Sequence, residues 1–271
     1  MKLKTIAKML LAAAIPLLVL GCGGENSAAP EKKVGMLTMA NVDAEKVDAA
    51  LSQKTTYYDD LNSLAMGLNS GQVDEIRTYQ SVANYMASRN PTLNVKESPS
   101  VQIMDSFCCA VREGDISLLN EINAAIDAME DDGTLENLVQ EYITNVQANE
   151  EPAAVAMPEI PGADTIKVGV TGDLPPLDLI RADGTPAGFN TAVFAEIGRR
   201  INKNIALVVI NSGARAAALT SGQVDVIFWM VVPAKESPLP SDADTPAGVS
   251  LTNAYYQDAS VSLHGAFSAI Q

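Results

Sequence analysis

The strongest constraint on the fold is a five-residue phrase, Ser-Gly-Gln-Val-Asp, which occurs at residues 70–74 and again at 221–225. In each copy a helical pattern runs into the phrase and a strand-like run follows it. Each copy therefore predicts a helix, a left-handed cap at Gly71 or Gly222, and a buried parallel strand. Glycine after a helix is common, but five identical residues in matching contexts favour two α/β units built on one plan.

Each unit also has a matching strand upstream. Residues 33–38 precede the first copy and residues 167–172 the second, and both begin Lys-Val-Gly. Turn and cap signals divide the rest of the chain into alternating elements. Helices are expected at 60–68, 81–88, 115–133, 134–142, 190–201 and 215–219, and strands at 107–111, 205–210 and 254–263.

The N-terminal residues have the form of an export signal. Three lysines precede an apolar run from Met9 to Leu20, which is too short to cross a bilayer comfortably. The run ends at Val-Leu-Gly-Cys, so Cys22 is expected to become a lipidated N-terminus, the alternative being an ordinary signal with an unrelated cysteine. Residues 23–33, rich in small and charged side chains, then form a tether between acyl chains on the membrane and the folded protein.

Charge and cysteine content exclude several classes of protein. The formal net charge is −15, and it becomes −18 when the three lysines of the signal are removed. A surface this acidic argues against nucleic acid as a partner. After Cys22 only the adjacent pair Cys108 and Cys109 remains, and these side chains are expected to be small buried residues, with no disulfide framework.

Signals for catalysis are scarce. His264 is the only histidine, and the chain has no Cys-x-x-Cys, His-Glu-x-x-His or glycine-rich phosphate loop. The acidic pairs at 59–60 and 131–132 fall at predicted helix ends, where solvated caps are the better interpretation than an acid and base. We therefore expect no enzyme, no catalytic residues, no metal site and no cofactor.

A binding cleft fits the pattern better. Ligand sites of parallel α/β sheets lie at the carboxyl ends of the strands, and two such lobes can enclose a small solute by hinge closure. An arginine at the start of a helix could hold a carboxylate while aromatic side chains form apolar walls, although core or surface positions are equally open for each residue. The candidate ligand-binding residues are Thr38, Tyr79, Asp173, Arg215, Trp229 and Tyr255.

Several segments resemble the bacterial extracellular solute-binding proteins of family 3, the receptors of polar amino acid ABC importers. Residues 166–170, Pro175-Pro176, 183–189 and 219–225 are similar to the opening half of that family. Residues 253–258 resemble its crossover into the second lobe, 33–90 resemble the second lobe itself, and 111–142 resemble the closing helices that return to the first lobe. The resemblance implies a two-lobe periplasmic binding protein-like (type II) α/β fold.

The order of these segments is unusual, because the later half of the family comes first. This implies a circularly permuted receptor, with two truncated tandem copies as the competing account; permutation is tolerated where chain ends lie close together on the surface. The expected divisions are a signal at 1–21, a tether at 22–33, a lobe 2-like domain at 34–105, a return strand and helices at 106–145, a linker at 146–165 and a lobe 1-like domain at 166–271.

The resemblance departs from the family at the ligand. The Thr-x-x-Arg segment that binds the α-carboxylate in amino acid receptors is replaced by Met230-Val231-Val232-Pro233, and the position of the aspartate that meets the α-ammonium is Tyr79. Each charge-assisted anchor is worth about 1.5 to 3 kcal/mol, so an α-amino acid is a doubtful ligand. A solute with one carboxylate held by Arg215 and an apolar body against Tyr79 and Trp229 is preferred.

The expected function is that of an extracytoplasmic, lipid-anchored receptor of an ABC importer. Its partners would be a small polar solute and a membrane permease, and the receptor would act as a monomer. The alternatives are an orphan ligand sensor or surface lipoprotein on the same fold and, from the enzyme class, a dehydratase-like catalyst, which would need an acid or base in the cleft that the motifs do not supply.

Overall fold

The computed structural model describes residues 32–96, 104–146, 150–237 and 239–265. The expected export signal and Cys22 lie outside these residues. Within the described residues, no helix combines the length and apolar character that crossing a membrane requires.

Strands early in the chain form a first half-sheet. β1 lies between β2 and β3 and is parallel to both, and the later strand β13 is antiparallel to β3 and to β4. The strands are β1 (Lys33–Leu37), β2 (Lys54–Tyr58), β3 (Glu75–Tyr79), β4 (Asn94–Lys96) and β13 (Tyr256–His264). The order is therefore β2-β1-β3-β13-β4.

A second half-sheet repeats this order with other strands. β6 lies between β10 and β11 and is parallel to both, and β5 is antiparallel to β11 and to β12. The strands are β5 (Met104–Arg112), β6 (Thr165–Val170), β10 (Asn204–Val209), β11 (Val226–Val232) and β12 (Val249–Leu251). The two units inferred from the repeated phrase thus share one strand order, β10-β6-β11-β5-β12 in this half.

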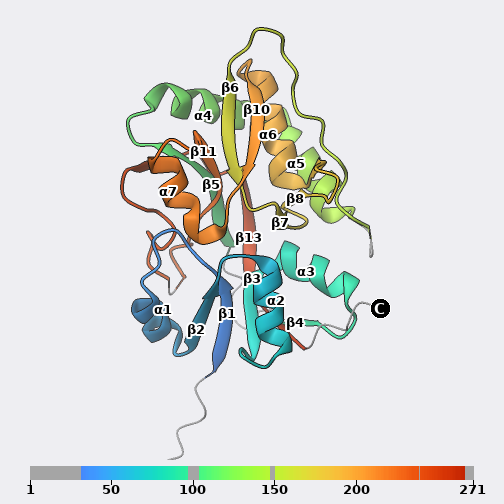
Figure 1. Cartoon of the computed structure of the whole chain (residues 1–271), viewed down its shortest axis with the longest axis vertical. Helices are drawn as coiled ribbons and strands as arrows, with labels where there is room; N and C mark the ends of the chain where they lie inside the picture. Colours follow the sequence, from blue (N-terminus) through green and yellow to red (C-terminus); the bar gives the residue numbers. More distant parts are fainter. Residues whose placement is uncertain (1–31, 97–103, 147–149, 238, 266–271) are drawn as a thin grey trace, which may run out of the picture. The chain divides into compact units, whose positions relative to one another are not determined.

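Two long strands join the half-sheets (Figure 1). The first part of β13 pairs with β5 through Tyr256 to Ala259, and its later part pairs with β3 through Ser260 to Leu263. Each half-sheet therefore contains an antiparallel strand from a distant part of the chain. β5 comes before the parallel strands of the second half-sheet, and β13 comes more than 170 residues after those of the first. A small sheet of β7 (Asp173–Leu174), β8 (Asp178–Ile180) and β9 (Pro186–Ala187) lies beside the second half-sheet.

Helices cover both half-sheets. The first half carries α1 (Ala44–Leu51), α2 (Leu61–Asn69) and α3 (Gln80–Arg89). The remaining helices are α4 (Ile116–Asp131), α5 (Thr134–Val139) with a π-helical turn at Gln140–Thr144, α6 (Phe189–Arg200), a short turn at Ser212–Ala214 and α7 (Arg215–Thr220). Both α4 and α5 contact α6, and Arg200 forms an ion pair with Asp132 at 2.8 Å, so the segment after β5 packs on the second half.

The glycine caps predicted from the repeated phrase are confirmed. Gly71 and Gly222 have φ angles of 72° and 78°, in the left-handed region that favours glycine. Each phrase is followed by a strand that pairs in parallel with its upstream neighbour, β3 with β1 and β11 with β6.

The predicted start of one helix was wrong. Asn190 does not cap α6, which begins at Phe189 with Gly188 as its N-cap. Gly188 has a φ of 98°, and a Cβ there would lie 2.7 Å from the Leu177 carbonyl oxygen, so the close approach to the preceding turn requires glycine. Asn190 is fully buried inside the helix instead.

The core runs through both half-sheets. Phe107, Phe189 and Phe228 are among its largest fully buried side chains. Cys108 and Cys109 are free and buried in β5, as the apolar context of that strand predicted. Burial raises the pKa of the Cys108 thiol to about 11, which keeps it protonated near neutral pH.

Candidate functional site

A cavity lies where β1, β3 and β11 end. Its walls include Leu37 from β1, Tyr79 from β3 and Trp229 from β11, together with Arg215 and Asp244. Carboxyl ends of parallel strands are where ligand sites of α/β sheets form, so this is the expected position. The cavity volume is about 40 Å³, which is room for a few water molecules.

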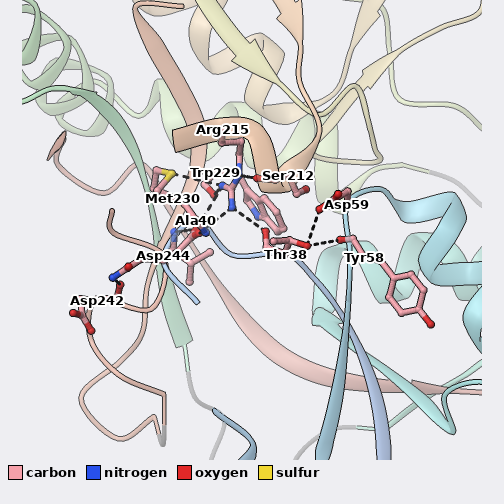
Figure 2. A network of polar contacts seen from close by, with 12 residues as sticks. Thr38, Ala40, Tyr58, Asp59, Ser212, Arg215, Trp229, Met230, Asp242 and Asp244 are labelled. Atoms are coloured by element: carbon pink, nitrogen blue, oxygen red, sulfur yellow. Dashed lines mark hydrogen bonds and ion pairs between the residues drawn. The ribbon is translucent and has the colours of Figure 1, made fainter. Parts of the chain in front are cut away.

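Arg215 is one of two arginines that line the cavity, with Arg77, and it is buried at 2% exposure. Its Nε donates to the Ser212 carbonyl oxygen at 3.0 Å and Nη1 to that of Trp229 at 2.5 Å. Nη2 donates to the Asp244 carboxylate at 2.9 Å and to the Thr38 carbonyl oxygen at 3.3 Å. Every nitrogen of the guanidinium therefore has a partner within the protein (Figure 2).

Asp244 comes from the irregular segment between β11 and β12 and is 1% exposed. Its Oδ1 accepts from the N–H of Ala40 at 2.5 Å and from Arg215, and its Oδ2 accepts from the N–H of Val231 at 2.9 Å. Burial raises the pKa of the Asp244 carboxyl, and the charge of Arg215 opposes this. The carboxylate thus lies in a cradle formed by one guanidinium and two backbone N–H groups.

Trp229 has an unusual backbone conformation. Its φ is 61°, and the pairing of β11 with β5 shifts register between Ile227 and Met230. For a large side chain this left-handed conformation costs about 1 to 3 kcal/mol, and such strain clusters at functional sites. The bulge aims the indole at the cavity, where its Nε1 is buried and has no hydrogen-bond partner among the described residues.

Tyr79 forms the opposite aromatic wall. Its ring meets those of Trp229 and Phe107 edge-on, with centroids 6.2 and 4.6 Å apart. Its hydroxyl lies near the Asp105 carboxylate, which accepts from the N–H of Ala234 at 3.0 Å. Burial raises the pKa of Tyr79 well above its ordinary value, and the neighbouring Asp105 charge adds to this effect, so the phenol stays protonated.

The other three candidate residues are not among those that line this cavity. The Thr38 carbonyl oxygen accepts from Arg215 at 3.3 Å, and the Thr38 hydroxyl donates to Asp59 at 2.9 Å. The Asp173 carboxylate accepts from the N–H of Leu61 at 2.8 Å, which joins β7 to the start of α2. Tyr255 is directed into the core of the second half, where its hydroxyl donates to Asn190 at 3.0 Å.

A second cavity, of about 460 Å³, lies beside α3. Polar side chains of α3 line one wall, and Tyr256, Asp258 and Pro176 line others. The Asp258 carboxylate accepts from the N–H of Ser81 at 3.1 Å, so the start of α3 already has an anion from the protein. None of the six candidate residues lines this cavity.

Sequence reasoning did not find the cradle partners of Arg215. Asp244 lies in a proline-rich segment without periodicity, and the N–H groups of Ala40 and Val231 carry no signal in a side-chain pattern. Asp105 could have been found, because it is a lone acid next to an apolar strand.

The family comparison covers the start of the second half. Residues 166–237, from β6 to the end of β11 and beyond, match the model of the bacterial extracellular solute-binding proteins, family 3. This range contains Arg215, Trp229 and Val231. No curated protein matches the sequence of the chain.

Solved structures of binding proteins are similar at low identity. The ligand-binding component of an ABC-type import system from Staphylococcus aureus, with zinc bound, shares 13% identity with a TM-score of 0.42; the match covers 86% of this chain and 65% of that one. The chain thus spans just under two thirds of that protein's length. The GluR0 ligand-binding core from Nostoc punctiforme in complex with L-glutamate shares 10% identity at a TM-score of 0.37, over 86% of this chain and 84% of that one.

The aliphatic sulphonate-binding protein SsuA from Escherichia coli shares 13% identity at a TM-score of 0.35, over 88% of this chain and 62% of that one. These likenesses are too distant to support an argument about this chain, and the family match covers 72 of its 271 residues. Residues 166–237 are therefore similar to the bacterial extracellular solute-binding proteins, family 3, and the rest of the chain lies outside that match.

Proposed function

We propose that the chain is an extracytoplasmic receptor that captures a small polar organic solute between its two halves and delivers it to the permease of an ABC importer. The observation that carries this proposal is the cavity at the ends of β1, β3 and β11, which has walls from both half-sheets. The family match of the second half supports the same function.

Capture requires the halves to open and close. The described contacts hold them together at the cavity: the N–H of Ser212 donates to the Asp59 carbonyl oxygen at 3.0 Å, and Arg215 reaches Thr38. A cavity of about 40 Å³ is too small for an organic solute, so the solute enters when these contacts open. Bending of β5 and β13, the strands that join the half-sheets, is the proposed hinge.

We assign Tyr79 and Trp229 as the walls that contact the solute. The indole N–H of Trp229, which has no hydrogen-bond partner in the part of the chain that the structure describes, would donate to an acceptor on the solute. Arg215 lies at the end of the cavity and would bind a carboxylate of the solute. Thr38, Asp173 and Tyr255 would hold the surrounding elements in place.

The proposed receptor is circularly permuted. Its lobe 2-like part is 34–105 and its lobe 1-like part is 166–271, with 106–145 packing on the latter and 146–165 as linker. The repeated strand order and the exchange of β5 and β13 support this division, because both are expected when one two-lobed chain is cut at a new place.

The anchor can be tested separately from binding. Cells that make the protein and are grown with a labelled fatty acid should give a labelled band that fractionates with membranes. Cys22→Ala should abolish the label and release the protein from the membrane fraction. An unlabelled wild-type band would contradict the lipid anchor and leave the proposed receptor function untouched.

Binding is tested by a thermal-shift screen of amino acids, organic acids and small peptides on the chain without its signal, followed by calorimetry. A true solute raises the melting temperature as its concentration rises, because it binds only the folded state. A screen over these classes in which no compound shifts the melting temperature would contradict the proposal.

An orphan sensor that does not transport is the second candidate. The observation that favours it is the full engagement of Arg215 by the protein's own groups. Uptake of the bound solute by cells separates the two functions. If the protein is a transport receptor, a variant that cannot bind the solute should abolish uptake, and if it is a sensor, the same variant should leave uptake unchanged.

A further inference from the structure

The cradle around Asp244 has the composition of a carboxylate-binding site. A guanidinium and two backbone N–H groups converge on one carboxylate, and such charge-assisted bonds are among the strongest hydrogen bonds in proteins. The donors come from separate elements: Ala40 follows β1 in the first half, Val231 lies in β11, and Arg215 begins α7. One carboxylate therefore bonds to both halves.

The carboxylate belongs to a strap, residues 239–248, which leads into β12 and lines the cavity through Leu239 and Asp244. Backbone carbonyl groups of the strap also bind Asn41. The Asn41 N–H donates to the Ala243 carbonyl oxygen at 3.3 Å, and the Asn41 side-chain amide donates to the Asp242 carbonyl oxygen at 3.1 Å. No helix or strand is formed between 239 and 248. Asp244 is thus a buried residue in the middle of an irregular segment.

Stability alone does not account for this arrangement. Desolvation of a buried ion pair largely cancels its attraction, and apolar packing of similar volume is often as stable. The pair lies in the wall of a ligand cavity, next to a tryptophan with a strained backbone and an unpaired N–H. These neighbours indicate a place where a ligand is exchanged.

We propose that the strap is a tethered competitor: the Asp244 carboxylate occupies the carboxylate site of the receptor, and a solute carboxylate binds there only when residues 239–248 withdraw. This rests on the proposed function and deepens it, because it assigns a carboxylate-bearing solute and a device that sets its affinity. It also explains how the halves are held together in the absence of a solute.

The tether multiplies the intrinsic affinity for a solute carboxylate by the fraction of time that the cradle is free. A group on a short flexible linker acts at an effective concentration in the millimolar range. If the cradle is free about 1% of the time, the apparent affinity for a carboxylate falls about 100-fold. Removing the Asp244 side chain should restore that factor.

The test uses acetate, which is the side chain of aspartate with a methyl group in place of the methylene. Wild-type protein, Asp244→Ala and the control Asp242→Ala, which removes an exposed acid from the same strap, are titrated with sodium acetate at constant ionic strength. Trp229 is the only tryptophan, so its emission reports the cradle directly. Asp244→Ala should bind acetate at least about tenfold more tightly than the other two proteins.

Equal acetate affinity in the three proteins, or no binding to Asp244→Ala, would overturn the competitor. Methylammonium at the same concentrations should leave the emission of Asp244→Ala unchanged; tighter binding of methylammonium than acetate would also overturn it. If Asp244→Ala does not fold by itself, the variant is refolded in the presence of acetate, and Asp244→Asn, which preserves the shape of the side chain, is refolded in the same way. Failure of acetate to restore folding counts against the proposal.

Hydrogen exchange separates a competitor from a purely structural ion pair. In wild-type protein saturated with acetate, amides of 239–248 should exchange faster while those of Ala40 and Val231 stay protected by the new carboxylate. Unchanged exchange in the strap at saturation would show that it does not withdraw. If wild-type protein binds a screened solute but Asp244→Ala gains no affinity for acetate, the tethered competitor is refuted and the proposed receptor function stands. If no screened solute binds but Asp244→Ala gains affinity for acetate, the proposed receptor function is refuted and the tethered competitor is not.

Discussion

Asp74 and Asp225, the last residues of the two copies of the repeated phrase, make the same contacts in the two halves. The Asp74 carboxylate accepts from the N–H of Lys33 at 3.1 Å, and the Asp225 carboxylate accepts from the N–H of Lys167 at 3.0 Å. In return each aspartate N–H donates to the carbonyl oxygen of the same lysine at 2.8 Å. The phrase therefore attaches the entry of β3 to β1, and that of β11 to β6.

The two aspartates should differ in their contribution to stability. Asp225 also pairs with the guanidinium of Arg112 at 3.0 Å, which links it to β5. We expect Asp74→Ala to lower the free energy of unfolding by about 1 kcal/mol and Asp225→Ala by about 2 kcal/mol. Urea denaturation measures both. Asp225→Asn keeps an acceptor for Lys167 and should fall between wild type and Asp225→Ala; a larger loss for Asp74→Ala than for Asp225→Ala would contradict this account.

The glycine of the second phrase should be required by its backbone conformation alone. A Cβ on Gly222 would meet nothing within 4 Å, but its φ of 78° is unfavourable for any other residue. Gly222→Ala should therefore lower the free energy of unfolding by about 1 kcal/mol. Gly114→Ala is the matched control, because that position has equal space and no positive φ, and it should be neutral within about 0.5 kcal/mol. Equal losses in both variants would disprove the conformational explanation.

Asp178 should make the protein less stable as the pH rises from about 4 to 6. Burial raises the pKa of its carboxyl to about 6 from the ordinary 3.8, although the Thr171 hydroxyl and the Gly172 N–H donate to it. In this pH window the folded chain binds more protons than the unfolded chain, so the free energy of unfolding falls with pH, by at most about 3 kcal/mol from this group.

Asp178→Asn isolates that contribution. The amide oxygen can still accept from Thr171 and Gly172 but does not ionise. The difference in stability between wild type and variant, measured by urea denaturation at pH 4, 5, 6 and 7, should shift in favour of the variant as the pH rises. A difference that does not change with pH would mean that Asp178 titrates normally in the folded protein.

Elements with strong local signals were predictable from the sequence. Asp60 accepts from the N–H of Ser63 at the start of α2, and α4 begins directly after Asp115 and buries Ile122 and Ile126. The helix and strand around each repeated phrase could be predicted because glycine fixes the boundary. These are cases in which capping chemistry and apolar periodicity agree.

Elements on the rim of the first half-sheet were not predicted. In α1 only Val47 is buried, so the helix has no apolar stripe. β2 carries the sequence Lys-Thr-Thr-Tyr-Tyr, with four half-buried residues at the edge of the sheet, and its polar side chains obscure the alternation. Tertiary pairing with β1 decides both, and a single sequence does not contain that information.

The candidate site was predictable only in part. Strand ends indicated Tyr79 and Trp229, and a helix start indicated Arg215, and these three side chains do line one cavity. The partner that fills the cradle could not be inferred, because Asp244 lies 29 residues after Arg215 in a segment without periodicity. Tyr255 was chosen as an aromatic residue near a strand, but alternation along the chain directs it into the core.

Calorimetric titration of residues 22–271, with and without Tyr79→Ala, using the solute found by the thermal-shift screen tests the central claim most directly. Tyr79 forms a wall of the cavity and is contributed by the first half, whereas the family match lies in the second. The account predicts one bound solute per chain and an affinity at least about tenfold weaker in Tyr79→Ala, since truncating a buried aromatic contact costs more than about 1.4 kcal/mol. Unchanged affinity in a folded Tyr79→Ala protein would contradict capture between the two halves.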